Sequence, residues 1–352
     1  MNYIHLIPFD KFCLDSCKII LESNAGNIIF IYGTSINYDD KNKLVLLKKK
    51  HNAKIYFSCS NIKFIQIVFI YFFIIIRYRG LKSIIHCTDI YNVKLFIILL
   101  IFFDHKYIWH IRGTDLYSPL NKNDNFFWCL INHFIYSRAF AIITNTIYDA
   151  QIAKNLYSNN LRHIKMIASP SNTLNLKLCK KIYSHKNNIL IGNSATYSSR
   201  SFLFLKEHIQ IIKNMQNYKF IFAASYGYKK YQQLIFEYSK GLNNIDVQTN
   251  FLEFNEFIDF LGGFNIAVLI PERLQGLGTL TYLLYFKCTI YTSQFSGMVH
   301  YLEQFKFNYK LLDNENQFLS PLEDKLLEEN RKIVSEYFSY ERCLKEWTNL
   351  KV

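Results

Sequence analysis

Short apolar segments alternate with mixed or polar segments along the first half of the chain, and this alternation predicts strands followed by helices. Each apolar segment is short enough for a strand that is buried in a parallel sheet. The predicted strands cover residues 3–7, 28–32, 55–57, 83–87, 106–111, 140–144 and 165–168. Polar turns and helical stretches such as residues 146–156 separate these strands, so we expect a mostly parallel sheet with helices on both faces.

The same pattern restarts after residues 169–186, a polar segment that contains Pro170 and four lysines. Further strands are predicted at residues 189–191, 220–223, 245–247, 266–270 and 288–291. A helix is expected to begin at about residue 198. Two more helical segments, interrupted near Ser339, are expected within residues 322–350.

These elements predict an α/β protein with two Rossmann-like domains that face each other across a cleft, an architecture called GT-B. The N-terminal domain is predicted at residues 1–170 and the second domain at residues 187–320. The C-terminal helices, at residues 321–352, are expected to cross back to the N-terminal domain. No internal sequence repeat relates the two halves, so their similarity is inferred from the pattern alone.

Two apolar runs in the first half, residues 67–76 and 95–103, lack strongly polar side chains. Both are shorter than the roughly 20 apolar residues that a membrane-spanning helix needs. One interpretation is that they are buried helices of the domain, the first within a helix predicted at residues 61–79. The other is that an exposed apolar helix rests on a membrane surface beside the neighbouring lysines.

The formal charge of the chain is +14, from 41 Lys and Arg and 27 Asp and Glu among 352 residues. Most of it lies in residues 1–168, which contain 20 basic and 10 acidic side chains. Such an excess favours an anionic partner: nucleic acid, a phosphorylated substrate or an anionic membrane surface. Long apolar runs interrupt the lysines, whereas a nucleic-acid-binding protein would present a continuous basic stripe. We therefore expect no nucleic-acid partner.

The eight cysteines are scattered, and only Cys13 and Cys17 lie close together in the sequence. Because there is no Cys-x-x-Cys pair and no Cys/His ladder, we expect reduced thiols and no structural zinc. The N-terminus lacks the basic and then apolar pattern of a signal peptide, so a cytoplasmic protein is expected.

The most informative stretch is residues 271–280, which joins a predicted strand to an apolar, helical run at residues 280–286. Gly276 and Gly278 form a turn before this helix, where free backbone N–H groups and the helix dipole favour an anion. A cation at Arg273 and a hydroxyl at Thr279 could add to such a site. The alternative is an ordinary strand-to-helix connection whose glycines only relieve steric strain.

A second loop of small residues, Gly192-Asn193-Ser194, follows the first strand of the second half. Its backbone has room to approach an anion closely. Asn and Ser at this position are also common helix caps, and that is the alternative interpretation. Together with the Gly276 turn, this loop offers two sets of N–H groups to one diphosphate.

In the first half, a predicted strand ends in the segment Trp109-His110-Ile111-Arg112-Gly113-Thr114-Asp115. Ligand crevices in open α/β sheets lie at this end of the strands. His110 or Asp115 is a candidate general base for an acceptor hydroxyl, because imidazole titrates near neutrality and the pKa of a carboxyl group can be raised. The alternative is that Asp115 caps a helix and that His110 is a hydrogen-bonded core residue.

The sequence contains no Asp-x-Asp motif, Walker A motif, GxGxxG motif or HExxH motif. These motifs hold metals, nucleotides or dinucleotides, so we predict no metal site and no cofactor. A diphosphate bound without a metal must be stabilised by helix N-termini, arginine and hydroxyl groups, and the second half contains all three. Glu272 is a candidate acid, or simply the ion-pair partner of Arg273.

These stretches together resemble the 4-alpha-L-fucosyltransferases, glycosyltransferase family 56. The matching positions occur in the family's order, from about residue 84 to about residue 350. They are Trp109-His110-Ile111, Gly113, Asp115, Leu116, Tyr117, Ile189 to Ser194, Leu252-Glu253-Phe254, Arg273, Gln275, Gly276, Gly278, Thr279, Leu280, Phe338-Ser339, Leu344 and Trp347. The chain departs from the family pattern at Arg112, where the family has an apolar aromatic residue, and at Glu272. The first 80 residues match poorly.

The resemblance implies transfer of 4-acetamido-4,6-dideoxygalactose (Fuc4NAc), or a related deoxy-amino sugar, from a dTDP-sugar donor. The implied acceptor is a polyprenyl-diphosphate-linked saccharide, as in the synthesis of enterobacterial common antigen. The implied location is peripheral, on the cytoplasmic face of the inner membrane. The base would be Asp115 or His110, and the residues that bind the donor would be Gly192, Asn193, Ser194, Arg273, Gln275, Gly276, Gly278 and Thr279. The alternative hypothesis is a GT-B enzyme that uses a UDP- or GDP-sugar in capsule or O-antigen assembly.

Overall fold

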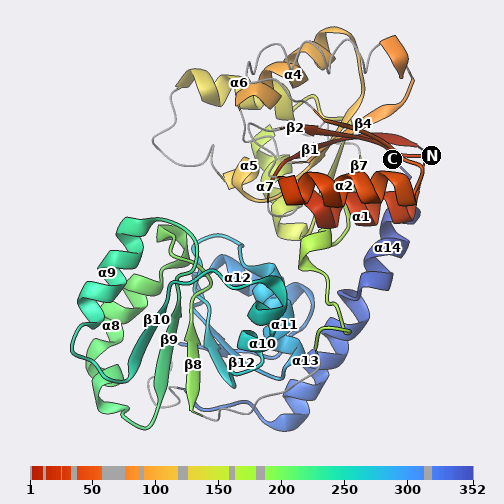
Figure 1. The fold of residues 1–352 in the computed structure, drawn as a ribbon. Helices are drawn as coiled ribbons and strands as arrows, with labels where there is room; N and C mark the ends of the chain where they lie inside the picture. The colour runs from red at the N-terminus through yellow and green to blue at the C-terminus, as the bar shows by residue number, and fades with distance from the viewer. Residues whose placement is uncertain are drawn as a thin grey trace. The chain divides into compact units, whose positions relative to one another are not determined.

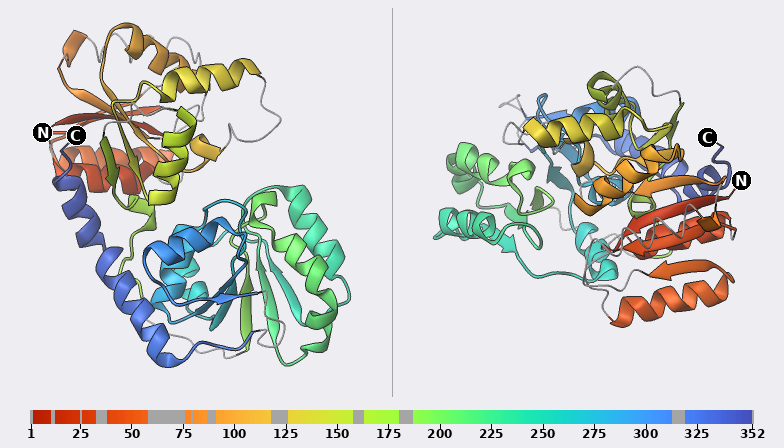
Figure 2. Two further views of the ribbon diagram at one scale, coloured as in Figure 1. Left: turned by 180° about the vertical axis from the view of Figure 1, so that it is seen from behind. Right: turned by 90° about the horizontal axis from the view of Figure 1, so that it is seen from above.

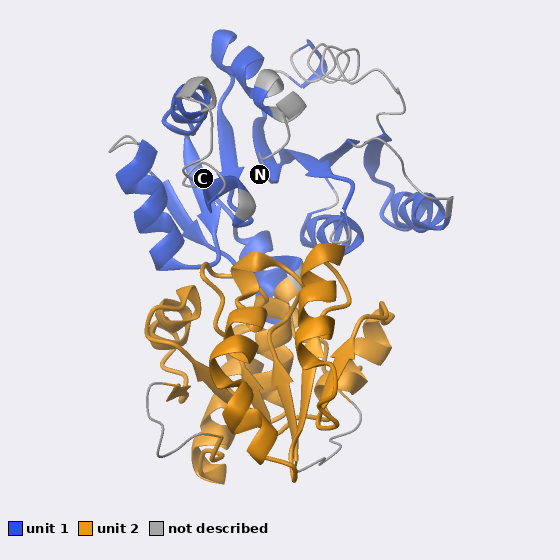
Figure 3. Ribbon diagram, turned by 90° about the vertical axis from the view of Figure 1, so that its left-hand side faces the viewer, with its two compact units in different colours: residues 1–171, 341–352 blue, residues 172–340 orange. Residues whose placement is uncertain are grey.

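The computed structural model describes residues 2–10, 13–24, 26–32, 38–57, 76–78, 80–86, 91–117, 126–157, 163–179, 187–312 and 319–351. The chain divides into two compact units, which are coloured separately in Figure 3. Unit 1 comprises residues 1–171 and 341–352, and unit 2 comprises residues 172–340. Each unit contains one sheet in which every described strand pair is parallel.

The sheet of unit 1 has seven strands in the order β3-β2-β1-β4-β5-β6-β7. The strands are β1 (Tyr3–Pro8), β2 (Ile28–Tyr32), β3 (Lys54–Phe57), β4 (Lys82–His86), β5 (Tyr107–His110), β6 (Ala141–Thr144) and β7 (His163–Met166). The chain runs outward from β1 to β3, returns to β4 beside β1, and then runs outward to β7. β1 and β4 therefore form the switch point of the sheet, and in such sheets ligands bind beyond the carboxyl ends of these strands.

Helices cover both faces of this sheet (Figures 1 and 2). They are α1 (Cys13–Ser23), α2 (Tyr38–Lys50), α4 (Tyr91–Phe102), α5 (Thr114–Tyr117), α6 (Phe126–Tyr136) and α7 (Ile147–Tyr157). On one face, Trp109 and Ile142 of the sheet pack with Ile97 of α4, Ile135 of α6 and Ala153 of α7 in a single apolar cluster. α1 and α2 lie side by side on the opposite face.

The apolar run at residues 95–103 belongs mainly to α4. Ile97 and Leu100 of this run are fully buried, whereas Phe102 and Phe103 are exposed. The described side chains of this run thus favour a buried helix with an exposed apolar end. The other apolar run, residues 67–76, lies outside the described residues except for Ile76. Within the described ranges, no helix is long and apolar enough to cross a membrane.

The sheet of unit 2 has six strands in the order β10-β9-β8-β11-β12-β13. The strands are β8 (Asn188–Ile191), β9 (Lys219–Ala223), β10 (Ile245–Gln248), β11 (Ile266–Val268), β12 (Thr289–Thr292) and β13 (Lys310–Leu311). The helices are α8 (Ser201–Asn214), α9 (Lys229–Ser239), α10 (Phe254–Leu261), α11 (Leu277–Tyr285), α12 (Gly297–Gln304) and α13 (Asp324–Tyr337). The switch point of this sheet lies between β8 and β11. The sequence did not predict β13, because two residues are too few for a periodic pattern.

The C-terminal helices are divided between the units. α13 ends at Tyr337 and belongs to unit 2, whereas nearly all of α14 (Tyr340–Thr348) belongs to unit 1. The predicted interruption near Ser339 is therefore confirmed. Unit 2 begins well before residue 187, because the Leu174 N–H donates a hydrogen bond to the Phe338 carbonyl (2.7 Å) of the same unit.

Candidate active site

In unit 2, the two loops predicted to bind an anion meet at the switch point. The first loop follows β8 and begins at Gly192, whose N–H donates to the Val268 carbonyl at the end of β11 (2.9 Å). The second loop follows β11 and leads to Gly276, which caps α11. The Ser198 hydroxyl of the first loop donates to the Gln275 side-chain oxygen of the second (2.9 Å).

Gly276 is the point of closest approach between these loops. Its φ of 73° lies in the left-handed region, which favours glycine. A Cβ atom at this position would lie only 2.4 Å from the side-chain nitrogen of Asn193. The structure thus gives both a conformational and a steric reason for glycine, and it brings Asn193 against the start of α11.

The N-terminus of α11 presents backbone donors at this place. Its first intrahelical hydrogen bond runs from the Leu280 N–H to the Gly276 carbonyl (2.9 Å). The N–H groups of Leu277, Gly278 and Thr279 precede that bond, so the helix itself supplies them with no acceptor. Gln275 adds a buried side-chain nitrogen for which the structure shows no hydrogen-bond partner. These groups are suited to an anion at the positive end of the helix dipole.

Arg273 and Glu272 have different surroundings. Glu272 is exposed and pairs at 3.9 Å with Arg200, so the predicted ion pair of Glu272 with Arg273 is replaced by one with Arg200. Arg273 is half-buried, and no hydrogen bond or ion pair joins its guanidinium to another residue that the structure describes. A half-buried cation without a protein partner is well suited to bind an anionic ligand.

Two residues outside the predicted site hold this loop in place. The Ser296 hydroxyl donates to the Pro271 carbonyl (2.8 Å), and the Gly297 N–H donates to the same oxygen (3.0 Å). A Cβ atom at Gly297 would lie 2.6 Å from the backbone of Arg273. The signal in the sequence is a Ser-Gly pair shortly after the strand predicted at residues 288–291.

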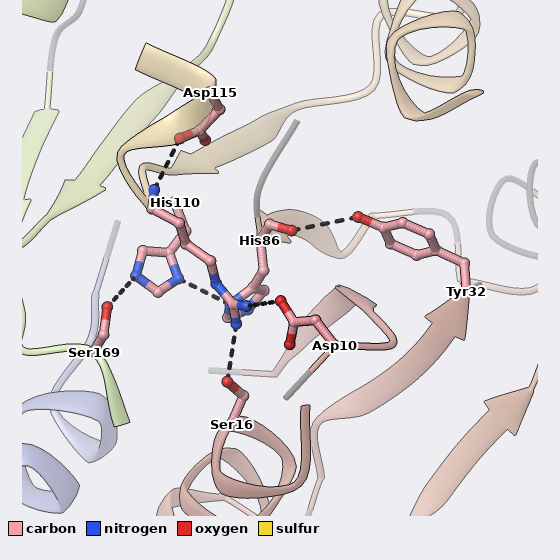
Figure 4. Close-up of polar contacts among 8 residues, drawn as sticks. Asp10, Ser16, Tyr32, His86, His110, Asp115 and Ser169 are labelled. Carbon is pink, nitrogen blue, oxygen red and sulfur yellow. Dashed lines mark hydrogen bonds and ion pairs between the residues drawn. The ribbon is translucent and has the colours of Figure 1, made fainter. Parts of the chain in front are cut away.

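In unit 1, Asp115 is fully buried in the first turn of α5. One carboxylate oxygen accepts a hydrogen bond from the Trp109 indole N–H (2.7 Å), and the other accepts from the Arg112 backbone N–H (3.0 Å; Figure 4). The side chain thus ties the end of β5 to the following turn. Both donors precede α5, so these bonds brace the turn between β5 and α5, and neither carboxylate oxygen is exposed to a substrate in solution.

His110 belongs to a buried chain of three histidines. His5 Nδ1 lies 3.1 Å from His86 Nε2, and His86 Nδ1 lies 2.8 Å from His110 Nδ1. His110 Nε2 lies 3.5 Å from the Ser169 hydroxyl, at the other end of the chain (Figure 4). Burial lowers the pKa of His5 to about 3 and holds the pKa values of His86 and His110 well below the usual range. The three imidazoles are therefore neutral, and the geometry matches the alternative in which His110 is a core residue.

A pair of oppositely charged side chains lies beside this chain. An Arg112 guanidinium nitrogen donates to the Asp10 carboxylate (3.0 Å), and the other donates to the Ser16 hydroxyl (2.9 Å). The Arg112 side chain is only 11% exposed, so the residue that departs from the family pattern points inward, to α1 and the loop after β1. Asp10 is not among the candidate residues that the sequence predicted. A carboxylate directly after the first strand is the signal that could have identified it.

The clusters described in the two units contain no group of three or more His, Cys, Asp or Glu suited to a metal ion, and the same holds for all other described residues. Within each unit, the predicted residues lie at the carboxyl end of the parallel sheet, where α/β proteins bind ligands. Unit 2 offers an anion site, and unit 1 offers charged groups around the ends of β1 and β5.

A protein-family model described as 4-alpha-L-fucosyltransferase glycosyl transferase group 56 matches residues 75–348. No curated protein matches the chain by sequence. Solved structures do resemble it. A glycosyltransferase from Rickettsia africae has a TM-score of 0.65 at 13% identity, and the alignment covers 98% of this chain and 96% of that one.

Two further solved structures have the same overall fold. Anabaena Alr3699/HepE in complex with UDP has a TM-score of 0.68 at 9% identity, with 98% of each chain covered. Sucrose-phosphate synthase from Thermosynechococcus elongatus has a TM-score of 0.66 at 10% identity, with 98% of this chain and 97% of that chain covered. At these identities the similarity establishes the fold alone. The predicted fold class, α/β with two Rossmann-like domains of the GT-B type, is confirmed.

Proposed function

This chain belongs to the 4-alpha-L-fucosyltransferases of glycosyl transferase group 56, and we propose that it transfers a deoxy-amino sugar, Fuc4NAc or a close relative, from a dTDP-sugar. The proposed acceptor is a saccharide linked to polyprenyl diphosphate, in the synthesis of a bacterial surface glycan such as enterobacterial common antigen. The reaction requires no metal in this proposal. Family membership supports a glycosyltransferase that uses a nucleotide sugar, and the donor and acceptor identities are our proposal.

The observation that carries the proposal is the anion site of unit 2. The half-buried Arg273, without a partner among the described residues, and the N-terminus of α11 are suited to the two negative charges of a diphosphate. We propose that Gly192, Asn193 and Ser194 contact the donor from the loop after β8. Gln275, Gly276, Gly278, Thr279 and Arg273 would contact it from the loop after β11. These groups would stabilise the nucleoside diphosphate as it leaves, which is the task a metal performs in other transferases.

The acceptor hydroxyl must lose its proton as it attacks the anomeric carbon. We propose that this happens at the carboxyl end of the unit 1 sheet, around the end of β5, which carries the buried His110 and is followed by the buried Asp115. The excess of basic residues in residues 1–168 supports an acceptor that carries phosphate and is embedded in an anionic membrane. The enzyme would then act as a peripheral protein on the cytoplasmic face of the inner membrane.

Donors with other nucleotides define the second candidate function. The unit 2 residues named above recognise a diphosphate, and a diphosphate is common to dTDP-, UDP- and GDP-sugars. A UDP- or GDP-dependent transferase of capsule or O-antigen assembly would use the same anion site. Anabaena HepE, whose fold is similar, was solved in complex with UDP. The nucleobase therefore has to be identified by experiment.

Thermal unfolding of the purified protein with dTDP, UDP, GDP or ADP, each with and without EDTA, tests the proposal. A ligand that binds only the folded protein stabilises it by about 2.7 kcal/mol when present at 100 times its Kd. We expect dTDP to raise the melting temperature most and EDTA to leave this rise unchanged. A selective response to UDP or GDP would support the second candidate, and no response to any nucleotide would contradict both.

A further inference from the structure

The described carboxylates near the ligand end of the unit 1 sheet differ in their exposure. Three of them lie within five residues after the end of a strand: Asp10 after β1, Asp115 after β5 and Asp149 after β6. Asp115 is fully buried, and Asp149 is nearly so and accepts a hydrogen bond from the Tyr117 hydroxyl (2.6 Å). The Asp10 side chain is 36% exposed. Asp10 is therefore the one of these three that a substrate can reach in this structure.

The backbone holds Asp10 at the switch point. Asp10 lies two residues beyond β1, and β1 pairs with β4 on the side where the strand order reverses. The preceding residue, Phe9, donates its N–H to the Tyr32 carbonyl (2.8 Å), and the Asp10 carbonyl accepts from the Cys13 N–H at the start of α1 (3.1 Å). The carboxylate thus stands on a fixed backbone at the position where open α/β sheets bind their ligands.

A series of hydrogen bonds inside unit 1 orients the Asp10 carboxylate. Asp115 accepts from the Arg112 backbone N–H, and Trp109 holds the other oxygen of Asp115. The Arg112 guanidinium donates hydrogen bonds to both Asp10 (3.0 Å) and Ser16 (2.9 Å; Figure 4). Together these two bonds fix the orientation of the planar guanidinium group. These contacts connect the buried Asp115 to the exposed Asp10. Asp115 acts on Asp10 through Arg112.

We propose that Asp10 is the catalytic base of the sugar transfer, an inference that rests on the proposed function. The acceptor oxygen forms a bond to the anomeric carbon. The bond from that carbon to the phosphate oxygen breaks, and its electron pair leaves with the nucleoside diphosphate. The proton of the acceptor hydroxyl passes to the Asp10 carboxylate, and water takes it up after the product leaves. Arg112 and Asp115 are positioning residues for Asp10.

The test compares Asp10→Asn with Asp39→Asn, an equal change of charge at an exposed position in the first turn of α2. The probe is transfer from dTDP-Fuc4NAc to lipid-linked saccharides extracted from bacterial membranes. We expect kcat to fall roughly 10²- to 10⁴-fold in Asp10→Asn, the usual contribution of a general base, and to stay at the wild-type value in Asp39→Asn. Both variants should keep the melting temperature and the stabilisation by dTDP, because the proposed nucleotide site lies in unit 2.

A second variant separates catalysis from structure. Asn can still accept the hydrogen bond from Arg112, so Asp10→Asn keeps the local geometry while losing the base. Asp10→Ala removes the whole carboxylate and leaves space for a small carboxylate ion such as formate. Added formate should restore part of the transfer by Asp10→Ala and none by Asp10→Asn, because formate can accept the proton only where the site has room for it.

The possible results are distinguishable. Wild-type kcat in Asp10→Asn would overturn the assignment and leave the proposed function intact. A second result would also overturn the assignment: Asp10→Asn and Asp10→Ala both lose activity, formate does not rescue Asp10→Ala, and both variants have a lower melting temperature than the wild type. Asp10 would then have a structural role. If the wild type neither binds a nucleotide nor transfers a sugar, the proposed function fails, and the assignment fails with it.

Discussion

Arg273 shows how a functional group can be recognised when its side chain has no partner among the residues that the structure describes. The neighbouring Glu272 pairs with Arg200, and the loop backbone is held by Ser296 and Gly297. The loop is therefore held by contacts that do not involve the Arg273 side chain. Folding alone gives no reason for a half-buried cation at this point, whereas a bound diphosphate does.

Replacement of Arg273 by Ala should therefore reduce activity far more than stability. We expect a change in unfolding free energy within about 0.5 kcal/mol, as for surface substitutions that break no contact. The rate should fall roughly 10²- to 10³-fold, as when one donor to a developing negative charge is removed. Thermal melts and transfer assays on Arg273→Ala and on the exposed control Lys213→Ala measure both quantities. An equal loss of folding and activity in Arg273→Ala would contradict the binding role.

Gly276 permits a sharper residue-scale test, because Gly241 provides a matched control. Both glycines have positive φ, 73° and 86°, but a Cβ atom at Gly241 would meet nothing within 4 Å, whereas one at Gly276 would meet Asn193. Gly241→Ala should cost about 1–2 kcal/mol of stability from backbone strain alone. Gly276→Ala should cost more and should also weaken stabilisation by dTDP. Equal melting temperatures for the two variants would show that the loops of the anion site do not pack as described.

At the scale of elements, strands β1, β4 and β5 place three buried histidines in one hydrogen-bonded chain, and α14 covers it. Trp347 of α14 stacks on His86 with ring centroids 5.8 Å apart, and its indole N–H donates to the Ala168 carbonyl (3.4 Å). Neutral imidazoles can satisfy this chain because each ring can both donate and accept. A second proton on any ring would place a positive charge in this buried cluster, and burial disfavours the charged form.

The three buried histidines predict a loss of stability in mild acid. The pKa of His5 is lowered to about 3 in the folded protein, whereas an unfolded histidine has a pKa of about 6.5. Between these values the unfolded state binds more protons, so stability falls as the pH falls, by about 2 kcal/mol from pH 6.5 to pH 5 for His5 alone. Denaturant titrations should show a weaker pH dependence in His5→Gln than in the wild type. The exposed control His163→Gln should keep the wild-type slope, and the same slope in His5→Gln would refute the role of the chain.

At the scale of the whole molecule, the chain forms two units with parallel sheets, and most of its positive charge lies in the part that forms unit 1. The described helices include none that could cross a membrane. The proposed lipid-linked acceptor nevertheless requires the enzyme to work at a membrane. Attraction between basic residues and anionic lipids can supply that contact without a spanning helix.

Binding to lipid vesicles tests this proposal. The protein should sediment with vesicles that contain anionic phosphatidylglycerol and should not sediment with vesicles of neutral phosphatidylcholine. High salt should release it, because the Debye length shrinks to about 3 Å at 1 M ionic strength. Equal binding to both kinds of vesicle, or none to either, would contradict an electrostatic membrane contact.

The predicted elements depended on local signals, and most were confirmed. A buried parallel strand is apolar throughout, so β2, β8 and β11 could be located within a few residues from sequence alone. Gly276 was correctly placed before the start of α11, where its positive φ favours glycine, whereas Gly278, predicted in the same turn, lies inside the first turn of the helix. Residues 38–50 gave no such signal, and no helix was predicted where α2 lies, since its apolar positions are few.

The alternation of strands and helices, the restart of the pattern in a second domain and the glycine turn at the anion site each depend on neighbouring residues, so all three could be predicted from the amino-acid sequence. The exposure of the polar residues of unit 1 depends instead on how the sheet and its helices pack. His110 and Asp115 look catalytic in sequence, yet side chains from β4 and β5 enclose them. Asp10 looks like an ordinary loop residue, yet it meets Arg112 at the switch point, 102 positions along the chain. Burial and contacts between distant residues arise only when the sheet assembles, so the position of a carboxylate after a strand does not show which of these carboxylates is exposed.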